Sequence, residues 1–121
     1  MIYFGVHKND VSAYQAKVDK IVSKIGDMRW LKNDEGRLDA TLRDINGQIM
    51  VISNFTLYAS NDKGAKMSFP DSAPAADAVL VYDLFVEKLR AAGFLVQTGK
   101  FGAMMEVTAT TLGPINYVLD V

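Results

Sequence analysis

The sequence predicts a single α+β domain spanning residues 1–121. Two segments place apolar residues at helical spacing, and several shorter segments are rich in β-branched and aromatic residues. Hydrophobic residues make up 50% of the chain, which supplies enough apolar surface for one buried core. These observations predict a mixed fold of short strands and two helices.

The first predicted elements are a strand and a helix. Residues 1–6 are mostly apolar, and the polar residues that follow offer Asn9 or Asp10 as a helix cap. Apolar side chains then recur at helical spacing over 11–25, and Gly26 stands where helices commonly end. We therefore expect a strand at the N-terminus that leads directly into a helix.

The middle of the chain predicts a short strand, a hairpin-like turn and a central strand. Residues 28–31 form a short apolar segment, and the Asn, Asp, Glu and Gly residues at 33–36 favour a turn. A second turn signal, Asn46-Gly47, precedes the run QIMVISNFTLYAS at 48–60, which is too β-branched and aromatic for a helix. We expect this run to form the central buried strand, and residues 60–75 to form a long polar loop.

The last part of the chain predicts a second helix and three strands. Apolar residues follow helical spacing over 75–92, and Gly93 supplies a stop signal. Short β-prone segments separated by glycine and proline come next. We expect these segments to form strands over 94–98, 105–111 and 115–121.

Composition excludes several classes of function. The chain has no cysteine and a single histidine, His7, so one chain cannot supply thiol chemistry or a zinc site of the usual ligands. The formal net charge is -1, so we expect RNA contacts to be local and expect no DNA partner. No apolar run approaches the roughly 20 residues that cross a bilayer, and the N-terminus does not resemble a secretory signal. We expect a cytoplasmic protein that needs neither cofactor nor metal.

The sequence also lacks conventional catalytic patterns. No G-x-S-x-G elbow accompanies His7, and no glycine-rich phosphate loop of either common type occurs. The neighbouring carboxylates Asp34 and Glu35 fall in a predicted turn, and Asp83 and Glu87 fall on the polar face of a predicted helix. We interpret both carboxylate pairs as solvated surface groups.

Two features have no such simple interpretation. Ser53 and Thr56 place hydroxyls within an apolar strand, where they either satisfy core hydrogen bonds or serve a chemical role. Gly113-Pro114 separates two predicted strands, and it marks either a plain turn or a cis peptide bond. These residues alone leave both pairs of alternatives open.

Four blocks of the sequence resemble the D-aminoacyl-tRNA deacylase family. Residues 53–58, SNFTLY, are similar to the family's S-Q-F-T-L strand, and 67–69, MSF, are similar to its R-P-S-F. The helical segment at 81–86 and the segment QTGKFGAMM at 97–105 are similar to its helix and its Q-T-G-x-F-x-A-x-M motif. The segment TLGPIN at 111–116 is similar to its N-x-G-P-V-T. The resemblance extends over nearly the whole chain.

This resemblance implies a fold and an activity. It implies layered β-sheets with two helices packed on one face, and a homodimer that hydrolyses the ester bond of D-aminoacyl-tRNA. The Gly113-Pro114 bond would be cis and would reach into the partner's pocket, where it excludes L-amino acids and admits glycine, including glycine mischarged on tRNA-Ala. The terminal 2′-hydroxyl of the tRNA would assist the reaction, while backbone amides stabilise the oxyanion.

The resemblance also implies a set of site residues, with no metal and no cofactor among the requirements. Catalysis would fall to Ser53, Phe55 and Thr56. Substrate binding would involve Asn54, Phe101, Ala103, Met105, Gly113 and Pro114, and RNA binding would involve Lys63, Lys66 and Lys100.

The chain departs from the family's pattern near the implied site. Asn54 replaces a glutamine, Lys66-Met67 replaces an Arg-Pro pair, Met104 replaces an aspartate, and Thr111 and Asn116 flank the Gly-Pro pair. The chain also begins after the point where the family has its first two strands. An alternative hypothesis is therefore a divergent, non-catalytic dimeric relative with a binding or structural role.

Overall fold

The computed structural model describes residues 1–62, 64–113 and 115–121. Its main sheet has three parallel strands in the order β1-β4-β5. These strands are β1 (Ile2–Phe4), β4 (Ile49–Ser53) and β5 (Val96–Thr98). Tyr3 pairs with Ile52, and Met50 pairs with Gln97, so β4 is the central strand, as the sequence predicted.

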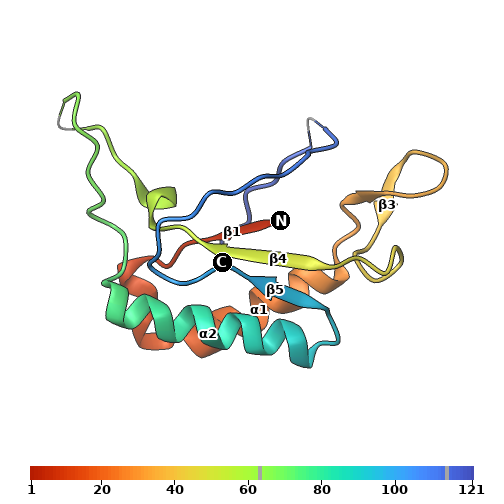
Figure 1. Ribbon diagram of the computed structural model, residues 1–121. Coiled ribbons are helices and arrows are strands. Elements are labelled where there is room, and N and C mark those ends of the chain that lie inside the picture. The colour runs from red at the N-terminus through yellow and green to blue at the C-terminus, as the bar shows by residue number, and fades with distance from the viewer. Residues whose placement is uncertain (63, 114) are drawn as a thin grey trace.

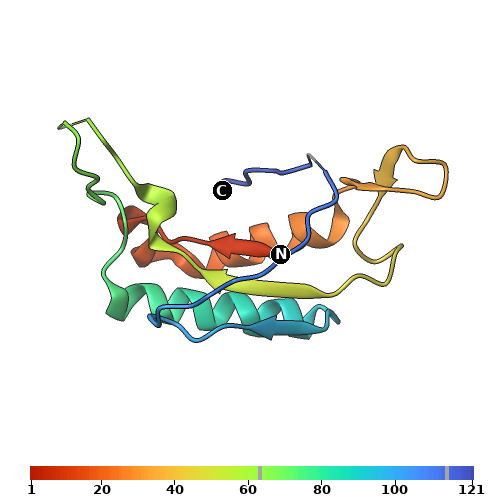
Figure 2. The same cartoon turned by 45° about the horizontal axis from the view of Figure 1, so that its top comes forward.

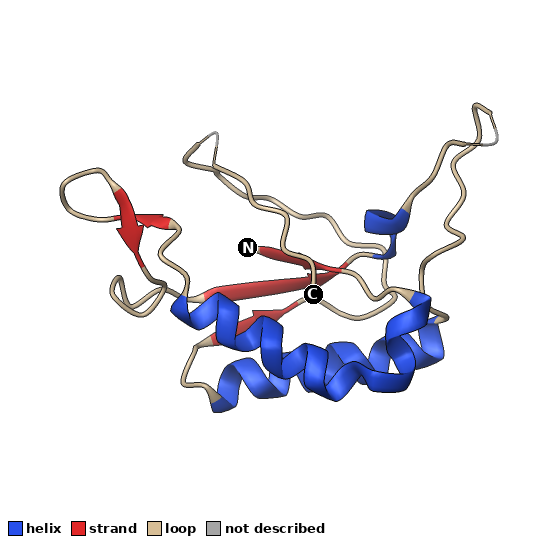
Figure 3. Cartoon of the chain, turned by 180° about the vertical axis from the view of Figure 1, so that it is seen from behind, coloured by secondary structure: helices blue, strands red, loops and turns tan. Residues whose placement is uncertain are grey.

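Two long helices cover one face of this sheet (Figures 1 and 3). Helix α1 (Tyr14–Asp27) connects β1 to β4, and helix α2 (Ala75–Ala91) connects β4 to β5. Both crossovers step across the sheet in the same direction, and β-α-β crossovers are right-handed, so both helices lie on the same face. The prediction of two helices packed on one face is confirmed.

The first helix begins and ends differently from the sequence prediction. A 3₁₀ helix, η1 (Lys8–Ala13), precedes α1, and its cap is His7, whose ring accepts a hydrogen bond from the Asn9 amide. Asn9 and Asp10 were wrongly predicted as caps because they already lie inside the first turn. Gly26 does not end the helix: it is buried, and a Cβ there would meet the Arg43 guanidinium at 3.3 Å.

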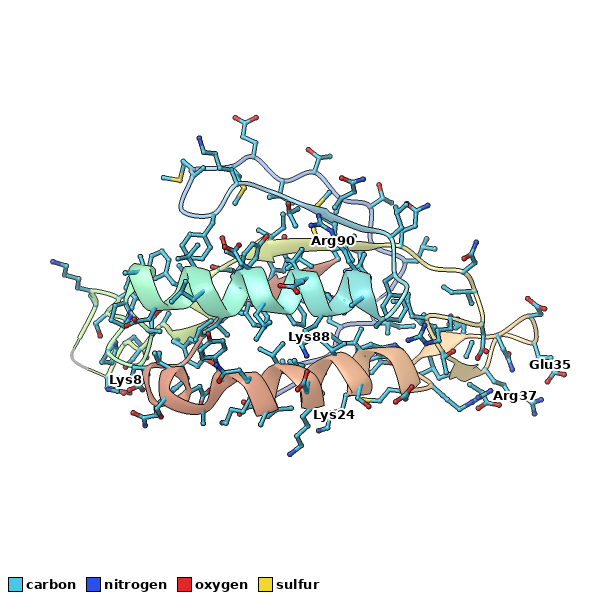
Figure 4. The ribbon with its side chains drawn as sticks, turned by 90° about the horizontal axis from the view of Figure 1, so that it is seen from below. Lys8, Lys24, Glu35, Arg37, Lys88 and Arg90 are labelled. Carbon is cyan, nitrogen blue, oxygen red and sulfur yellow. The ribbon has the colours of Figure 1, made fainter. Side chains whose placement is uncertain are left out.

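The core lies between the sheet and the two helices. Phe85 and Leu89 of α2 and Val51 of β4 are its largest fully buried side chains. The ring of Phe4 stacks on that of Phe85, with centroids 4.2 Å apart and planes 9° apart. On the outer side, Lys88 of α2 reaches across the helix pair to Asp19 of α1 at 2.9 Å (Figure 4). The second helix and its Gly93 stop, where φ is +92°, were predicted correctly.

A two-stranded antiparallel hairpin projects from one end of the molecule (Figure 1). It consists of β2 (Leu31–Lys32) and β3 (Leu38–Ala40), joined through the turn predicted at 33–36. The predicted strand at 28–31 therefore lies mostly before β2, and β3 was not predicted. The Asn33 side chain holds the turn by accepting hydrogen bonds from the amides of Glu35 and Arg37 at 3.0 Å each.

The central strand is shorter than predicted. It ends at Ser53, and Phe55–Tyr58 form a 3₁₀ turn, η2, in place of the expected strand. The Asn54 side chain accepts a hydrogen bond from the Thr56 amide, and this local bond bends the backbone away from the sheet. Phe55 and Thr56 are therefore exposed turn residues, and the prediction of a buried Thr56 hydroxyl was wrong.

The tail after β5 also differs from the prediction. Within the described residues, 105–113 and 115–121 contain no strand, because they run out from the sheet and back without a neighbouring ladder (Figures 1 and 2). The returning part is fixed by the Tyr117 hydroxyl, which donates to the Trp30 carbonyl at 2.8 Å, and by Leu119, which packs against the core. The tail crosses the side of the sheet that faces away from the helices.

That side of the sheet remains partly uncovered. Tyr3 of β1 and Met50 of β4 are 45% and 40% exposed, and Leu95 just before β5 is 53% exposed. Adjacent strands therefore present apolar side chains that the tail does not fully cover. Within the described residues, no helix is long and apolar enough to span a membrane.

Candidate functional site

The sheet brings several predicted site residues to one edge. Because β1, β4 and β5 run parallel, their carboxyl ends lie at the same edge, where ligands bind in many open parallel sheets. Ser53 is the last residue of β4 and pairs with Phe4 of β1. The segment Asn54, Phe55 and Thr56 follows directly, so the whole first motif projects from this edge.

A compact hydrogen-bond pattern fixes this segment. The Asn54 amide donates to the Phe4 carbonyl at 2.8 Å, which ties the turn to the end of β1. The Asn54 side-chain oxygen Oδ1 accepts two hydrogen bonds, from the Thr56 amide at 3.1 Å and from the Thr56 hydroxyl at 2.6 Å. Thr56 is therefore exposed to solvent while both of its donors point back at one oxygen of Asn54.

The second motif packs against the first. Ser60 and Ser68 exchange backbone hydrogen bonds of 2.8 and 2.9 Å, and this bridge closes the base of the polar loop. It places the Phe69 ring edge-on against Phe55, with centroids 4.8 Å apart. Both rings are exposed, at 36% and 57%, so they form an open aromatic surface beside Thr56.

The third motif divides between the two faces of the sheet. Phe101 turns toward the helices, where its ring lies 5.5 Å from that of Tyr82. Met105 lies on the other face, where a Cβ at Gly99 would meet the Met105 sulfur and the Ile52 side chain. The absence of a side chain at Gly99 is what lets Met105 lie next to the end of β4.

Among the described residues, no hydrogen bond links the remaining predicted residues to the Asn54–Thr56 turn. Ala103, Lys66 and Lys100 are exposed loop residues. Gly113 is exposed as well, and within 4 Å of a Cβ built there the described atoms belong only to Thr111 and Ile115. Lys63 and Pro114 were also predicted as site residues, and they lie outside the described residues.

Nearly the whole chain matches one protein family. A family model for D-Tyr-tRNA(Tyr) deacylase matches residues 1–120. The chain belongs to this family. A D-aminoacyl-tRNA deacylase of Aquifex aeolicus (strain VF5) is 36% identical over 119 residues, covering 98% of this chain and 78% of that protein.

Two further comparisons agree with this family. A D-aminoacyl-tRNA deacylase of Listeria monocytogenes serotype 4b is 43% identical over 103 residues, covering 85% of this chain and 69% of that protein. The solved structure of a c-Myc DNA Unwinding Element Binding Protein has a TM-score of 0.73 and 29% sequence identity, covering 86% of this chain and 69% of that chain. The fold and the sequence therefore place the chain among the deacylases, while these relatives extend beyond the matched segment.

The deacylase fold also forms a polar cavity that the sequence analysis missed. Its volume is about 400 Å³, and it lies beside Tyr58, the last residue of η2. The lining residues are His7, Asp10, Lys17, Tyr58, Asp120 and Val121. A possible signal was the polar sequence that follows the first strand, since β1 and β4 end at the same edge.

Most charges in this cavity are paired. Lys17 bonds to Asp10 at 2.7 Å and to the Val121 backbone oxygen at 2.9 Å. The His7 ring lies edge-on to Tyr58, with centroids 5.4 Å apart. Burial, followed by the negative charges of Asp120 and Asp10, raises the pKa of Tyr58, so its phenol remains protonated at neutral pH.

The first motif offers hydrogen bonding at the carboxyl edge of the sheet. Ser53, Asn54 and Thr56 provide hydroxyl, amide and backbone donors, but none of them is an acid or a base near neutral pH. Among the described residues, no group of three or more His, Cys, Asp or Glu side chains could hold a metal ion. Hydrogen-bond donors of this kind can stabilise negative charge that develops on a substrate oxygen.

Proposed function

We propose that this protein hydrolyses the ester bond between a D-amino acid and tRNA, releasing the free D-amino acid and tRNA for translation quality control. Family membership over residues 1–120 supports this function. The observation that carries it is the Asn54–Thr56 turn, which places the amides of Phe55 and Thr56 at the carboxyl edge of the sheet, with the Thr56 amide held by the Asn54 side chain. The enzyme is thus an aminoacyl-tRNA hydrolase.

The proposed reaction uses the backbone rather than an acid-base pair. Water attacks the carbonyl carbon of the ester, and the carbonyl oxygen becomes an oxyanion that needs hydrogen-bond donors. The amides of Phe55 and Thr56 are suitable donors because they lie in the first turn of η2, where amides have no partner inside the helix. The terminal 2′-hydroxyl of the tRNA assists, since Ser53, Asn54 and Thr56 supply no general base.

The working unit that we propose is a homodimer with its substrate pocket between copies. A Cβ built at Gly113 would meet described atoms of Thr111 and Ile115, and the role that we propose for Gly113 is in the pocket of a second chain. There, Gly113 and Pro114 exclude L side chains by steric clash and admit glycine, including glycine on tRNA-Ala. Phe101, Ala103 and Met105 would complete the pocket.

The remaining elements of the proposal concern partners and location. Lys63, Lys66 and Lys100 contact the tRNA phosphates in this proposal, and the exposure of Lys66 and Lys100 in loops supports this role. The enzyme acts in the cytoplasm as a single domain, without cofactor or metal. DNA is not a partner in this proposal, although the name of the solved relative mentions a DNA element.

The deciding experiment compares D-tyrosyl-tRNA with L-tyrosyl-tRNA. We expect purified protein to release tyrosine from the D-form alone, and a Pro114→Ala variant to lose selectivity. Pro70→Ala, an exposed loop substitution, is the matched control and should behave as wild type. If folded protein cleaves neither substrate, the non-catalytic dimeric relative becomes the better hypothesis.

The shared pocket can be tested by mixing two variants that alter opposite sides of it, each of which must first be found inactive alone. Thr56→Ala removes one side of the proposed pocket, and Gly113→Ala perturbs the other, because its Cβ would lie 2.7 Å from the Ile115 nitrogen. Random exchange of subunits makes about half of the dimers heterodimers, and each heterodimer has one intact pocket of two. Activity should therefore recover to about a quarter of wild type. No recovery in mixtures that do exchange subunits would argue for a pocket within one chain.

Binding of a DNA duplex comparable to that of tRNA would contradict the proposed choice of partner.

A further inference from the structure

The side chain of Asn54 occupies one of the two backbone amides that the proposed reaction needs, the amide of Thr56. Its Oδ1 accepts both the Thr56 amide, at 3.1 Å, and the Thr56 hydroxyl, at 2.6 Å. A backbone N–H has one hydrogen to donate, so an amide bonded to Asn54 is not available to a substrate oxygen at the same time. We propose that Asn54 is an autoinhibitory positioning residue that must release Thr56 before the oxyanion can bind. This inference rests on the proposed function.

The surrounding backbone keeps Asn54 in this position. Its amide is bonded to the Phe4 carbonyl at 2.8 Å, and its backbone is extended, with φ of -148°. This is the geometry of a helix cap, in which a short side chain folds over the first turn and accepts an amide two residues later. Release therefore needs only rotation of the Asn54 side chain, while the backbone stays anchored to β1.

The length of the side chain determines the effect. Asparagine is among the best helix caps, whereas alanine cannot accept the hydrogen bond and glutamine is not a favoured cap. Both Asn54→Ala and Asn54→Gln should therefore free the Thr56 amide. If the substrate must otherwise displace this cap, removing it should raise kcat/KM for D-tyrosyl-tRNA about fivefold, the factor that corresponds to one typical cap.

A direct substrate contact by Asn54 makes the opposite prediction. If the Asn54 carboxamide binds the substrate, its truncation to alanine lowers kcat/KM. The sign of the rate change therefore separates the two roles, and a loss of stability alone cannot produce an increase in rate.

Asn33 provides a matched control. Its side-chain oxygen also accepts two local hydrogen bonds, from the amides of Glu35 and Arg37, in the hairpin between β2 and β3. Asn33→Ala should lower the melting temperature about as much as Asn54→Ala, yet leave kcat/KM unchanged. This control separates the effect of freeing the Thr56 amide on the rate from the loss of stability that follows when any such side-chain cap is removed.

The experiment combines kinetics with amide hydrogen exchange. We expect faster exchange of the Thr56 amide and a rise of about fivefold in kcat/KM for both Asn54 variants, with neither change in Asn33→Ala. Faster exchange with an unchanged or lower rate would overturn the inference and leave the hydrolase function standing. Unchanged exchange would show that Asn54 does not hold the amide in solution, which also overturns it. Absence of hydrolysis from the wild type and from both folded variants would instead refute the proposed function, and the inference with it.

Discussion

Phe85 offers the most direct test of how α2 supports the site. Its side chain is fully buried and stacks on Phe4 with ring centroids 4.2 Å apart. Phe4 in turn holds the Asn54 amide through its carbonyl at 2.8 Å. Replacing Phe85 with alanine therefore leaves a cavity directly behind the strand that anchors the site.

The expected cost is large. Truncating a buried phenylalanine to alanine removes its transfer free energy and leaves a cavity, a loss of about 3–5 kcal/mol in well-packed cores. A domain of this length is expected to have a free energy of unfolding of roughly 6–18 kcal/mol. Phe85→Ala should therefore remove a substantial share of the stability, while Leu80→Ala, at a position of α2 that is 57% exposed, should change it by less than about 0.5 kcal/mol.

Urea denaturation at a fixed protein concentration measures this loss. With a slope m of about 2 kcal/mol per molar urea, a loss of about 4 kcal/mol lowers the midpoint by about 2 M without changing m. A loss below about 1 kcal/mol would refute the close packing of α2 against β1. Equal losses for Phe85→Ala and Leu80→Ala would likewise refute the assignment of the buried face.

Three further predictions concern local interactions. Burial raises the pKa of Tyr82 above 10.0, so stability is complete below about pH 10 and falls as pH rises through the folded pKa; Tyr82→Phe should flatten this fall in denaturation measured across that range. The hydrogen bond from Lys8, with its charge, lowers the pKa of Asp71 below 3.8, so the stability it contributes above about pH 4 is lost on acidification. Asp71→Asn should remove that dependence, and an acid titration identical to wild type would contradict it. Asn46 has φ of +49°, so Asn46→Ala should cost about 1 kcal/mol, whereas Asn46→Gly should lie within a few tenths of wild type in thermal unfolding.

The elements predicted correctly are those whose signals are local. Apolar spacing located α2, and Gly93 marked its end, because a helix forms all its backbone hydrogen bonds within itself. The apolar residues of β4 identified a central strand because that strand is covered by neighbours on both edges. The alternation of strand, helix and strand along the chain is typical of a parallel sheet, although the sequence analysis predicted no strand order from it.

The errors occur where another interaction outweighs residue preference. Phe55 to Tyr58 have strong strand preferences, yet the Asn54 side chain caps the Thr56 amide and turns the chain. Gly26 was predicted to end α1 because glycine often does so. The helix runs one residue further, to Asp27, and Gly26 is buried where an added Cβ would meet the Arg43 guanidinium, a neighbour that no local pattern contains.

The tail shows why the candidate site could be predicted only in part. Residues 53–56 are positioned by hydrogen bonds to β1 and within η2, so a sequence motif there corresponds directly to a structure. The segments at 105–111 and 115–121 have strand-like composition, but a strand needs a second backbone as a hydrogen-bond partner, and the described chain offers them none. Gly113 lies between these segments, and a Cβ built there would meet described atoms of Thr111 and Ile115. The part of the candidate site at Gly113 therefore stays a prediction, because the described chain gives its motif no hydrogen-bond partner of the kind that fixes residues 53–56.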